Sequence, residues 1–324
     1  MIEITPVKNL NAAVSVPGSK YIANRLLIIC ALANGTSVLK NVPDNDDINN
    51  AIKAIKEFGI NIEKNNDTLT IVGNGGKLKA PKNEINVGDS GTLLRFIAGF
   101  AALANGKTTI TGSKRIQERP ISDLLKSLRD LGIKCDSTDN HAPIIIHGGN
   151  LKGGKTSIKG DVSSQFISSL LMVSPFAKND IEISVIGKLV SSEYADLTIN
   201  LMKEFGVNTE RSGNNFKVKS NQKYKARSFV IPSDWASANY FLAAAAIVPG
   251  TIRIDNLDFR SKQPESGFYK VLKEMGCKIS LDGNSIKIIG NNKLNGIEAD
   301  MSSMPDSAQT LAAVALFAGG KTII

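Results

Sequence analysis

The sequence predicts an α/β protein built from repeated βαβαββ units, each about 70 residues long. Four segments share one pattern of apolar, charged and glycine residues: IKEFGI (55–60), LRDLGI (128–133), MKEFGV (202–207) and LKEMGC (272–277). Their glycines, Gly59, Gly132, Gly206 and Gly276, recur at intervals of 73, 74 and 70 residues. A fixed interval of this kind indicates copies of one supersecondary unit.

Each of these segments is predicted to end an amphipathic helix. Around the second segment, Leu124, Leu125, Leu128 and Leu131 recur at helical spacing. The glycine stands where a helix needs a left-handed residue after its C-terminus. Strands with alternating apolar residues are expected next, at Thr68–Val72, Ile144–His147, Phe216–Lys219 and Ile286–Ile289.

A second kind of helix is expected upstream in every unit. These helices are apolar nearly all round, so we expect them to be fully buried. They are Asn24–Ala33, Thr92–Ala104, Gln165–Phe176, Ala236–Val248 and Ala308–Ala318. Each leads into a short strand, at GTSVL, GKTTI, NDIEI, GTIRI and GKTII. Four units are complete, and a fifth begins near Ala299 and stops inside its second strand.

Composition favours a soluble globular protein with anionic ligands. The 324 residues suffice for two domains. Lysine and arginine outnumber acidic residues by 39 to 30, and this net charge of +9 favours anionic partners. We expect no nucleic acid, because basic runs with interleaved aromatics are missing. We expect no membrane, because the apolar stretches are too short to span one and the N-terminus has no apolar signal region.

Cysteine and histidine usage favours neither disulfides nor a metal. Cys30, Cys135 and Cys277 are scattered and odd in number, which is typical of reduced thiols in a cytoplasmic protein. His141 and His147 could form a metal pair. No cysteine or carboxylate cluster has ligand spacing, however, so exposed strand positions are the favoured interpretation.

Every buried helix begins from a turn rich in Gly, Ser and Asp. The turns are 17–20, 88–92, 161–165, 232–234 and 305–307. Helix N-termini bind anions, but Ser and Asp also cap helices, and any single turn favours the cap alone. Basic residues beside the turns favour an anion site, and these are Lys20, Arg25, Arg95, Arg119 and Lys159. Together they predict a basic cleft for small, multiply charged anions.

Seven segments together resemble the 3-phosphoshikimate 1-carboxyvinyltransferase (EPSP synthase) family of enolpyruvyl transferases. They are VPGSK with NR (16–20, 24–25), GDSGTLLR (88–95), QERP (117–120), DVSSQF (161–166), LVSSEY (189–194), PSDWASANYFLAAAA (232–246) and MPDSAQT (304–310). The resemblance implies two domains with a cleft between them. It also implies transfer of the enolpyruvyl group of phosphoenolpyruvate to the 5-hydroxyl of shikimate 3-phosphate, without a cofactor, by a cytoplasmic monomer.

The resemblance also implies the domain boundaries. Residues 21–227 should form a first domain of three units, and residues 1–20 with 228–324 a second, incomplete domain. The family's Lys-Glu-x-x-Arg segment, a later His-Arg pair and a near-terminal lysine have no counterpart before Ile324. We therefore expect a C-terminally truncated chain that is inactive alone.

The resemblance implies three groups of site residues. Shikimate 3-phosphate would be bound by Lys20, Tyr21, Arg25, Ser163, Ser164, Gln165, Ser191, Tyr194 and Asp306. Phosphoenolpyruvate would be bound by Lys20, Gly91, Arg119 and Gln165. Lys20 would stabilise charge in the intermediate, and Asp306 would be the general base. The alternative role of Asp306 is the N-cap of the following helix.

Two positions depart from the family pattern, and three other functions remain open. Tyr21 replaces a serine, and Phe96 replaces a proline. A UDP-N-acetylglucosamine enolpyruvyl transferase would need a cysteine in the loop 112–120 and an asparagine after Lys20, and both are missing. An RNA 3′-phosphate cyclase would need a nucleophilic histidine, and neither histidine is suitably placed. A fragment that only binds shikimate 3-phosphate is the third alternative.

Overall fold

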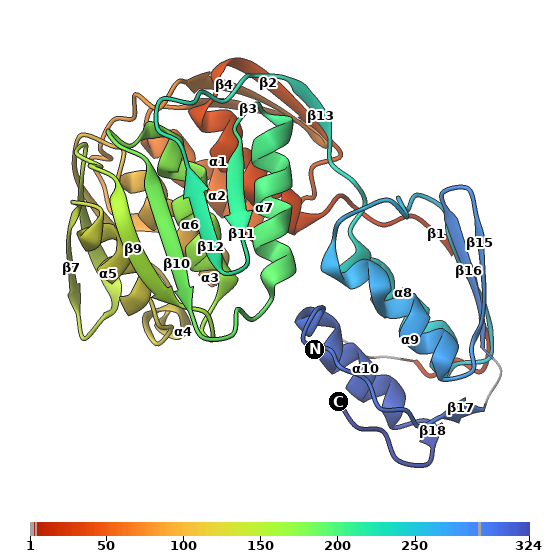
Figure 1. Cartoon of the computed structure of the whole chain (residues 1–324). Coiled ribbons are helices and arrows are strands. Elements are labelled where there is room, and N and C mark those ends of the chain that lie inside the picture. The colour runs from red at the N-terminus through yellow and green to blue at the C-terminus, as the bar shows by residue number, and fades with distance from the viewer. Residues whose placement is uncertain (1–2, 4, 291–292) are drawn as a thin grey trace. The chain divides into compact units, whose positions relative to one another are not determined.

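A computed structural model describes residue 3, residues 5–290 and residues 293–324 of the chain. It divides into a smaller unit, Met1–Ser19 with Pro232–Ile324, and a larger unit, Lys20–Ile231 (Figure 1). Lys20 thus belongs to the larger unit, although the sequence suggested a boundary after it. The predicted second domain also includes residues 1–2, 4 and 291–292, which lie outside the described residues.

Three four-stranded sheets in the larger unit share one strand order. In each, the first strand is parallel to the second, and the third is antiparallel to the second and fourth. The first sheet is β13 (Ser228–Val230), β2 (Asn34–Lys40), β4 (Thr68–Asn74) and β3 (Asn61–Asn65). The second is β5 (Ile85–Asn86), β6 (Gly106–Thr111), β8 (His141–Gly148) and β7 (Lys134–Thr138). The third is β9 (Gly154–Lys159), β10 (Ile181–Ile186), β12 (Asn215–Val218) and β11 (Thr209–Ser212).

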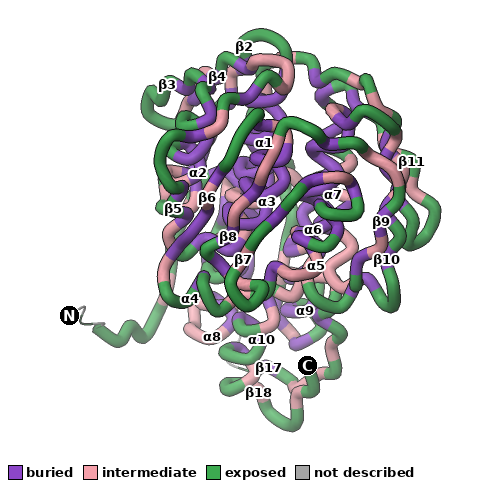
Figure 2. Tube along the Cα trace, turned by 90° about the vertical axis from the view of Figure 1, so that its left-hand side faces the viewer, coloured by how far each residue is buried: buried purple, intermediate pink, exposed green. Residues whose placement is uncertain are grey.

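Each sheet of the larger unit is associated with one buried and one amphipathic helix. The buried helices are α1 (Lys20–Leu32), α3 (Gly91–Ala101) and α6 (Ser164–Val173), with α3 packed on both α1 and α6. Buried residues, purple in Figure 2, concentrate along them. The amphipathic helices are α2 (Asp46–Glu57), α5 (Ser122–Asp130) and α7 (Ser192–Glu204). Apolar burial along these helices is the main stabilising contribution.

The smaller unit contains one sheet of the same order and the start of another. The sheet is β1 (Leu10–Val14), β14 (Gly250–Ile254), β16 (Ser285–Gly290) and β15 (Lys278–Asp282). It is accompanied by α8 (Trp235–Ile247), the 3-10 turn η2 (Pro264–Gly267) and α9 (Phe268–Glu274). The fifth unit has β17 (Leu294–Asn295), η3 (Pro305–Ser307), α10 (Ala308–Ala315) and β18 (Ala318–Gly319). Strands β17 and β18 are parallel.

The four repeat glycines occupy equivalent helix ends, as predicted. Their φ angles are 84° at Gly59, 91° at Gly132, 89° at Gly206 and 105° at Gly276. Each glycine N–H donates to the carbonyl three residues earlier, at 2.9–3.0 Å. The carbonyl just before each glycine accepts from a later backbone N–H, that of Lys79, Lys152, Lys225 or Asn295. Because a side chain is disfavoured at positive φ, glycine suits these turns.

Three details differ from the prediction. The strand expected at GKTII (320–324) is instead β18 (Ala318–Gly319). The third buried helix ends at Val173 and continues as the 3-10 turn η1 (Ser174–Phe176), because Pro175 lacks the N–H that an α-helix requires. Full burial holds for α1, α3 and α6 but is wrong for the smaller unit. There Tyr240 on α8 is 57% exposed and Leu316 after α10 is 84% exposed. Only these two apolar helices belong to the described part of that unit, whereas three pack together in the larger one.

Two strands do not pair with the strands of the repeat whose buried helix comes next in the chain. β1 precedes α1 but pairs with β14, and β13 precedes α8 but pairs with β2. The chain therefore passes between the units twice. Its two connecting segments pair with each other, where Ser19 N–H donates to Pro232 O and Asp234 N–H donates to Pro17 O, both at 2.8 Å.

Candidate active site

Two arginines of the larger unit converge at the N-terminus of α3. A Cβ on Gly91 would lie 2.4 Å from Arg95 Nη1 and 2.8 Å from Arg119 Nη1. Arg95 is on α3, and Arg119 follows the short helix α4 (Lys114–Gln117). Within the described residues neither guanidinium takes part in an ion pair. Two close cations beside free helix N–H groups form a site for an anion.

Burial makes this cationic pair costly without an anion. Arg95 is 4% exposed, and its Nε has no hydrogen-bond partner among the residues that the structure describes. Burial, followed by repulsion from Arg119, lowers the pKa of Arg95 to about 10. Arg95 Nη2 donates to Pro120 O at 3.1 Å, and the Arg95 guanidinium lies 5.6 Å from the centre of the Phe166 ring. Arg95 is one of the basic residues beside the predicted turns, but it was not expected among the site residues. A charge inside the apolar stretch LLRFIAGF is the signal that could have found it.

The turn before α6 lies next to α3 and presents a free acceptor. Gln165 Nε2 donates to Thr92 Oγ1 at 3.1 Å, whereas Gln165 Oε1 is buried and has no partner in the described part of the chain. Ser163 is the N-cap of α6, and its hydroxyl accepts from Gln165 N–H at 3.2 Å. Ser164 is the first, buried residue of the helix. A buried acceptor without a donor is unfavourable in the free protein, so a ligand hydroxyl is a suitable partner.

Lys20 and Tyr21 form the N-terminus of α1. The Lys20 Nζ lies 5.3 Å from the centre of the Tyr21 ring and 3.9 Å from Asp47 Oδ2 on α2. The Tyr21 ring packs against Tyr194 of α7 with ring centres 5.3 Å apart. The tyrosine that replaces a serine therefore has a packing partner. Nothing in the sequence pointed to Asp47, which is brought to Lys20 by the packing of α2 on α1.

Arg25, a predicted contact of shikimate 3-phosphate, donates hydrogen bonds from its guanidinium to three helices. It is 2% exposed, and its guanidinium donates to protein acceptors on α1, α6 and α7. These acceptors are Thr198 Oγ1 (2.7 Å), Tyr21 O (2.8 Å), Tyr194 O (3.3 Å) and Ser168 Oγ (3.4 Å). Phe96 lies with its ring centre 5.4 Å from the same guanidinium, which gives the second departure from the family pattern a structural role. Arg25 thus ties three helices together.

The remaining predicted site residues are Ser191 and Asp306. Ser191 precedes α7 with a φ of 53°, a left-handed conformation that is strained for serine and recurs at functional sites. Asp306 is an exposed residue of η3 in the smaller unit. The N-cap position of α10 is Ser307, whose side chain makes no capping hydrogen bond, and Asp306 lies one residue earlier.

The histidines and cysteines lie apart from the predicted site residues. His147 Nε2 pairs with Asp136 Oδ2 at 2.9 Å, and both side chains are partly exposed. No cluster of three or more His, Cys, Asp or Glu side chains suited to a metal occurs among the described residues. Among the same residues, no helix has the length and apolar character needed to cross a membrane. All three cysteines are free and buried, and burial raises the pKa of Cys30 and Cys135 to about 12.

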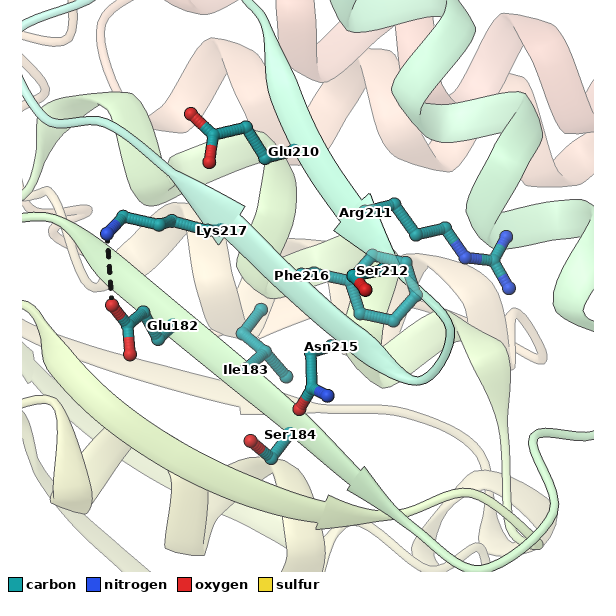
Figure 3. Close-up of a pocket in the computed structure, with 9 residues that line it drawn as sticks. All are labelled: Glu182, Ile183, Ser184, Glu210, Arg211, Ser212, Asn215, Phe216 and Lys217. Carbon is teal, nitrogen blue, oxygen red and sulfur yellow. Dashed lines mark ion pairs between the residues drawn. The ribbon is translucent and has the colours of Figure 1, made fainter.

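A pocket of about 270 Å³ lies on the third sheet of the larger unit (Figure 3). Its charged side chains are already paired within the protein. Glu182 accepts from both Lys217 (3.1 Å) and Lys155 (2.9 Å), and Arg211 pairs with Asp196. None of the predicted site residues lines this pocket. Its chemistry is that of a solvated sheet face.

Comparison with known proteins identifies the family of the chain. The family model for EPSP synthase (3-phosphoshikimate 1-carboxyvinyltransferase) matches residues 4–324. The chain belongs to the EPSP synthase family. The 3-phosphoshikimate 1-carboxyvinyltransferase of Pseudoalteromonas translucida is 38% identical over 329 residues, which cover 100% of this chain and 77% of that protein. The chloroplastic enzyme of Brassica napus is 37% identical, covering 100% of this chain and 67% of that protein.

Solved structures of the EPSP synthase family share the fold. An EPSP synthase from Acinetobacter baumannii superposes with a TM-score of 0.82 and 25% identity. The match covers 98% of this chain and 73% of that one. The α/β fold class expected from the repeats is confirmed by this likeness.

Proposed function

We propose that the chain transfers the enolpyruvyl group of phosphoenolpyruvate to the 5-hydroxyl of shikimate 3-phosphate, giving 5-enolpyruvylshikimate 3-phosphate and phosphate. Membership of the EPSP synthase family supports the reaction. The convergence of Arg95 and Arg119 at Gly91 is the structural observation that favours it most. A small substrate with a carboxylate and a phosphate supplies the negative charge that this cationic pair needs.

Phosphoenolpyruvate is assigned to the N-terminus of α3. Arg119 and the N–H groups around Gly91 would hold one anionic group. Arg95, from the next turn of α3, would add a second positive charge. A glycine at position 91 leaves this space open, since any side chain would fill it. Lys20 and Gln165 complete the proposed contacts.

Shikimate 3-phosphate is assigned to the turns before α6 and α7. The hydroxyls of Ser163, Ser164 and Ser191 suit its phosphate, and Gln165 Oε1 is an acceptor for a ring hydroxyl. Tyr21 and Tyr194 would contribute ring packing. Arg25 would act through the backbone carbonyls of these two residues, which it holds in place.

The chemistry needs a base, a cation and a proton that is added to C3 of phosphoenolpyruvate and later removed. Asp306 would take the proton of the 5-hydroxyl as its oxygen attacks C2 and C3 takes up a proton from solvent, giving a tetrahedral intermediate. Lys20 would stabilise the charge of that intermediate, and loss of a C3 proton with cleavage of the bond from C2 to the phosphate oxygen would then release phosphate. The function in UDP-N-acetylglucosamine metabolism is not favoured, because each cysteine is a buried thiol rather than a reactive loop residue. We further propose a cytoplasmic monomer.

Calorimetry with each substrate tests the proposal. Shikimate 3-phosphate should bind, and Gln165→Ala should weaken its binding at least about tenfold, because a ligand hydroxyl loses its acceptor. Any phosphate released should require both substrates, and Lys20→Met or Asp306→Ala should reduce its rate by about a hundred- to ten-thousandfold. Lys53→Met, on the exposed face of α2, is the matched control. Equal affinities in wild type and Gln165→Ala would remove Gln165 from the site.

A further inference from the structure

The segment 112–120 contains Arg119. The first residues of this segment are hydrogen-bonded to the turn before α3. Ser113 N–H donates to Gly88 O at 3.0 Å, and the Ser113 hydroxyl donates to Asp89 Oδ1 at 2.5 Å. Gly112 packs so closely on the same turn that a Cβ there would lie 2.7 Å from Gly88 O. The hydroxyl to carboxylate bond is charge-assisted, which makes it one of the stronger kinds of hydrogen bond.

Further contacts continue from this fastening to Arg119. The N–H groups of Ile116 and Gln117 donate to Ser113 O at 2.9 and 3.0 Å, which forms the turn of α4. Ile116 is fully buried beneath the segment. Arg119 N–H then donates to Ile116 O at 3.1 Å. These hydrogen bonds connect the backbone of Arg119, through Ile116, to that of Ser113.

The far end of the segment is tied to the same helix. Arg95 donates from Nη2 to Pro120 O at 3.1 Å, one residue after Arg119. Asp89 and Arg95 belong to one continuous stretch, the turn and first two turns of α3. Both ends of the segment are therefore hydrogen-bonded to the N-terminal part of α3, where the proposed anion site lies.

We propose that Asp89 and Ser113 are positioning residues that hold the segment 112–120 so that Arg119 faces Gly91 before any ligand binds. A guanidinium placed in advance does not have to be ordered when the anion arrives, and preorganisation of this kind increases affinity. The inference deepens the proposed function and rests on it, because it takes Arg119 as a contact of phosphoenolpyruvate.

The pair predicts selective loss of one substrate. Ser113→Ala should weaken binding of phosphoenolpyruvate, titrated in saturating shikimate 3-phosphate, by about tenfold. Binding of shikimate 3-phosphate alone should be unchanged, since its proposed contacts lie on α1, on η3 and at the starts of α6 and α7, outside the segment 112–120. Asp89→Ala should have the same effect, and the double variant should be no weaker than either single one, because both remove one interaction.

Two variants serve as controls. Ser113→Thr keeps the hydroxyl and should retain wild-type affinity. Ser122→Ala makes the same chemical change in the first residue of α5, two residues past Pro120, and should have no effect. Hydrogen exchange should report faster exchange of the amides of Ile116, Gln117 and Arg119 in Ser113→Ala but not in Ser113→Thr.

The results separate this inference from the proposed function. Unchanged affinity for phosphoenolpyruvate in Ser113→Ala would overturn the inference and leave the function standing. Equal loss for both substrates would also overturn it, because a general structural defect would then explain the result. If wild type bound neither substrate, the proposed function would fail, and unchanged amide exchange in Ser113→Ala would still refute the fastening.

Discussion

Arg95 and Arg119 point their Nη1 atoms at a single place, 2.4 and 2.8 Å from where a Cβ of residue 91 would stand. One arginine is part of a buried helix and the other follows a short surface helix, 24 residues further along the chain. Like charges at this separation repel each other, and burial lowers the pKa of Arg95 to about 10. An arrangement that is unfavourable in the free protein is expected to gain from an anion, which offsets the repulsion.

Gly91→Ala should weaken phosphoenolpyruvate binding by about ten- to a hundredfold, because the new methyl group would displace both guanidinium groups. The protein should remain folded, since the atoms in the way are the far ends of flexible side chains and alanine is favourable in a helix. Calorimetry measures the affinity, and shikimate 3-phosphate binding is the internal control. Wild-type affinity for phosphoenolpyruvate in the variant would show that the anion lies elsewhere.

Phosphoenolpyruvate binding should weaken as the pH rises through about 10. The pKa of Arg95 in the free protein is about 10. The cationic form is the one that attracts the anion, so it is present below this pH and is lost above it. Affinities measured between about pH 8 and about pH 10.5 test this linkage. Arg95→Gln should bind weakly throughout and lose the Arg95-dependent step, and a wild-type profile with the same shape as Arg95→Gln would contradict the prediction.

Ser163 should affect stability and binding separately. Ser163→Ala removes the N-cap of α6 and should lower the free energy of unfolding by about 1 kcal/mol, whereas Ser163→Gly should lower it by only a few tenths. Both variants lose the hydroxyl and should lose the same affinity for shikimate 3-phosphate. Denaturant titration and calorimetry on the two variants separate the roles. Affinity that followed stability instead would leave Ser163 as a cap alone.

Gly132→Ala should lower the free energy of unfolding by about 1–2 kcal/mol, because alanine is strained at a φ of 91°. The new Cβ would also lie 2.7 Å from Lys152 Cγ. Gly206→Ala should cost a similar amount, since its φ is 89° and its position in the repeat is the same. Gly99→Ala on α3 is a contrasting variant, because its Cβ would collide with Ser169 in the core whereas its φ is not in the left-handed region. A negligible effect at Gly132 would contradict the equivalence of the repeat glycines.

Local structure could be predicted well wherever a short segment contains its own physical cause. The repeat glycines end their helices through backbone geometry within a few residues, so the patterns EFG, DLG and EMG were enough. The buried helices followed from apolar composition, although Pro175 shortened one of them. The anion sites expected at helix starts rest on Gly, Ser and basic residues close together in sequence, and they remain predictions.

Contacts between distant segments could not be predicted in this way. The helical pattern marks Arg25 as a residue of α1, but its partner Thr198 lies 173 residues away. The convergence of Arg95 with Arg119 depends on how the segment 112–120 returns to α3. The expected full burial of α8 failed because exposure depends on which other helices pack against it, and composition does not contain that information.

Local patterns were enough to predict the repeating unit, most of its helices and strands, and the family to which the motifs point. These properties arise from local backbone preferences and from residues that remain neighbours in any fold. The pairing of β1 with β14 and of β13 with β2, the hydrogen bonds of Arg25 to three helices, and the convergence of two arginines became visible only in the folded chain. Parallel pairing and charge convergence join segments far apart in the chain, and their free energies depend on distances that no local pattern encodes.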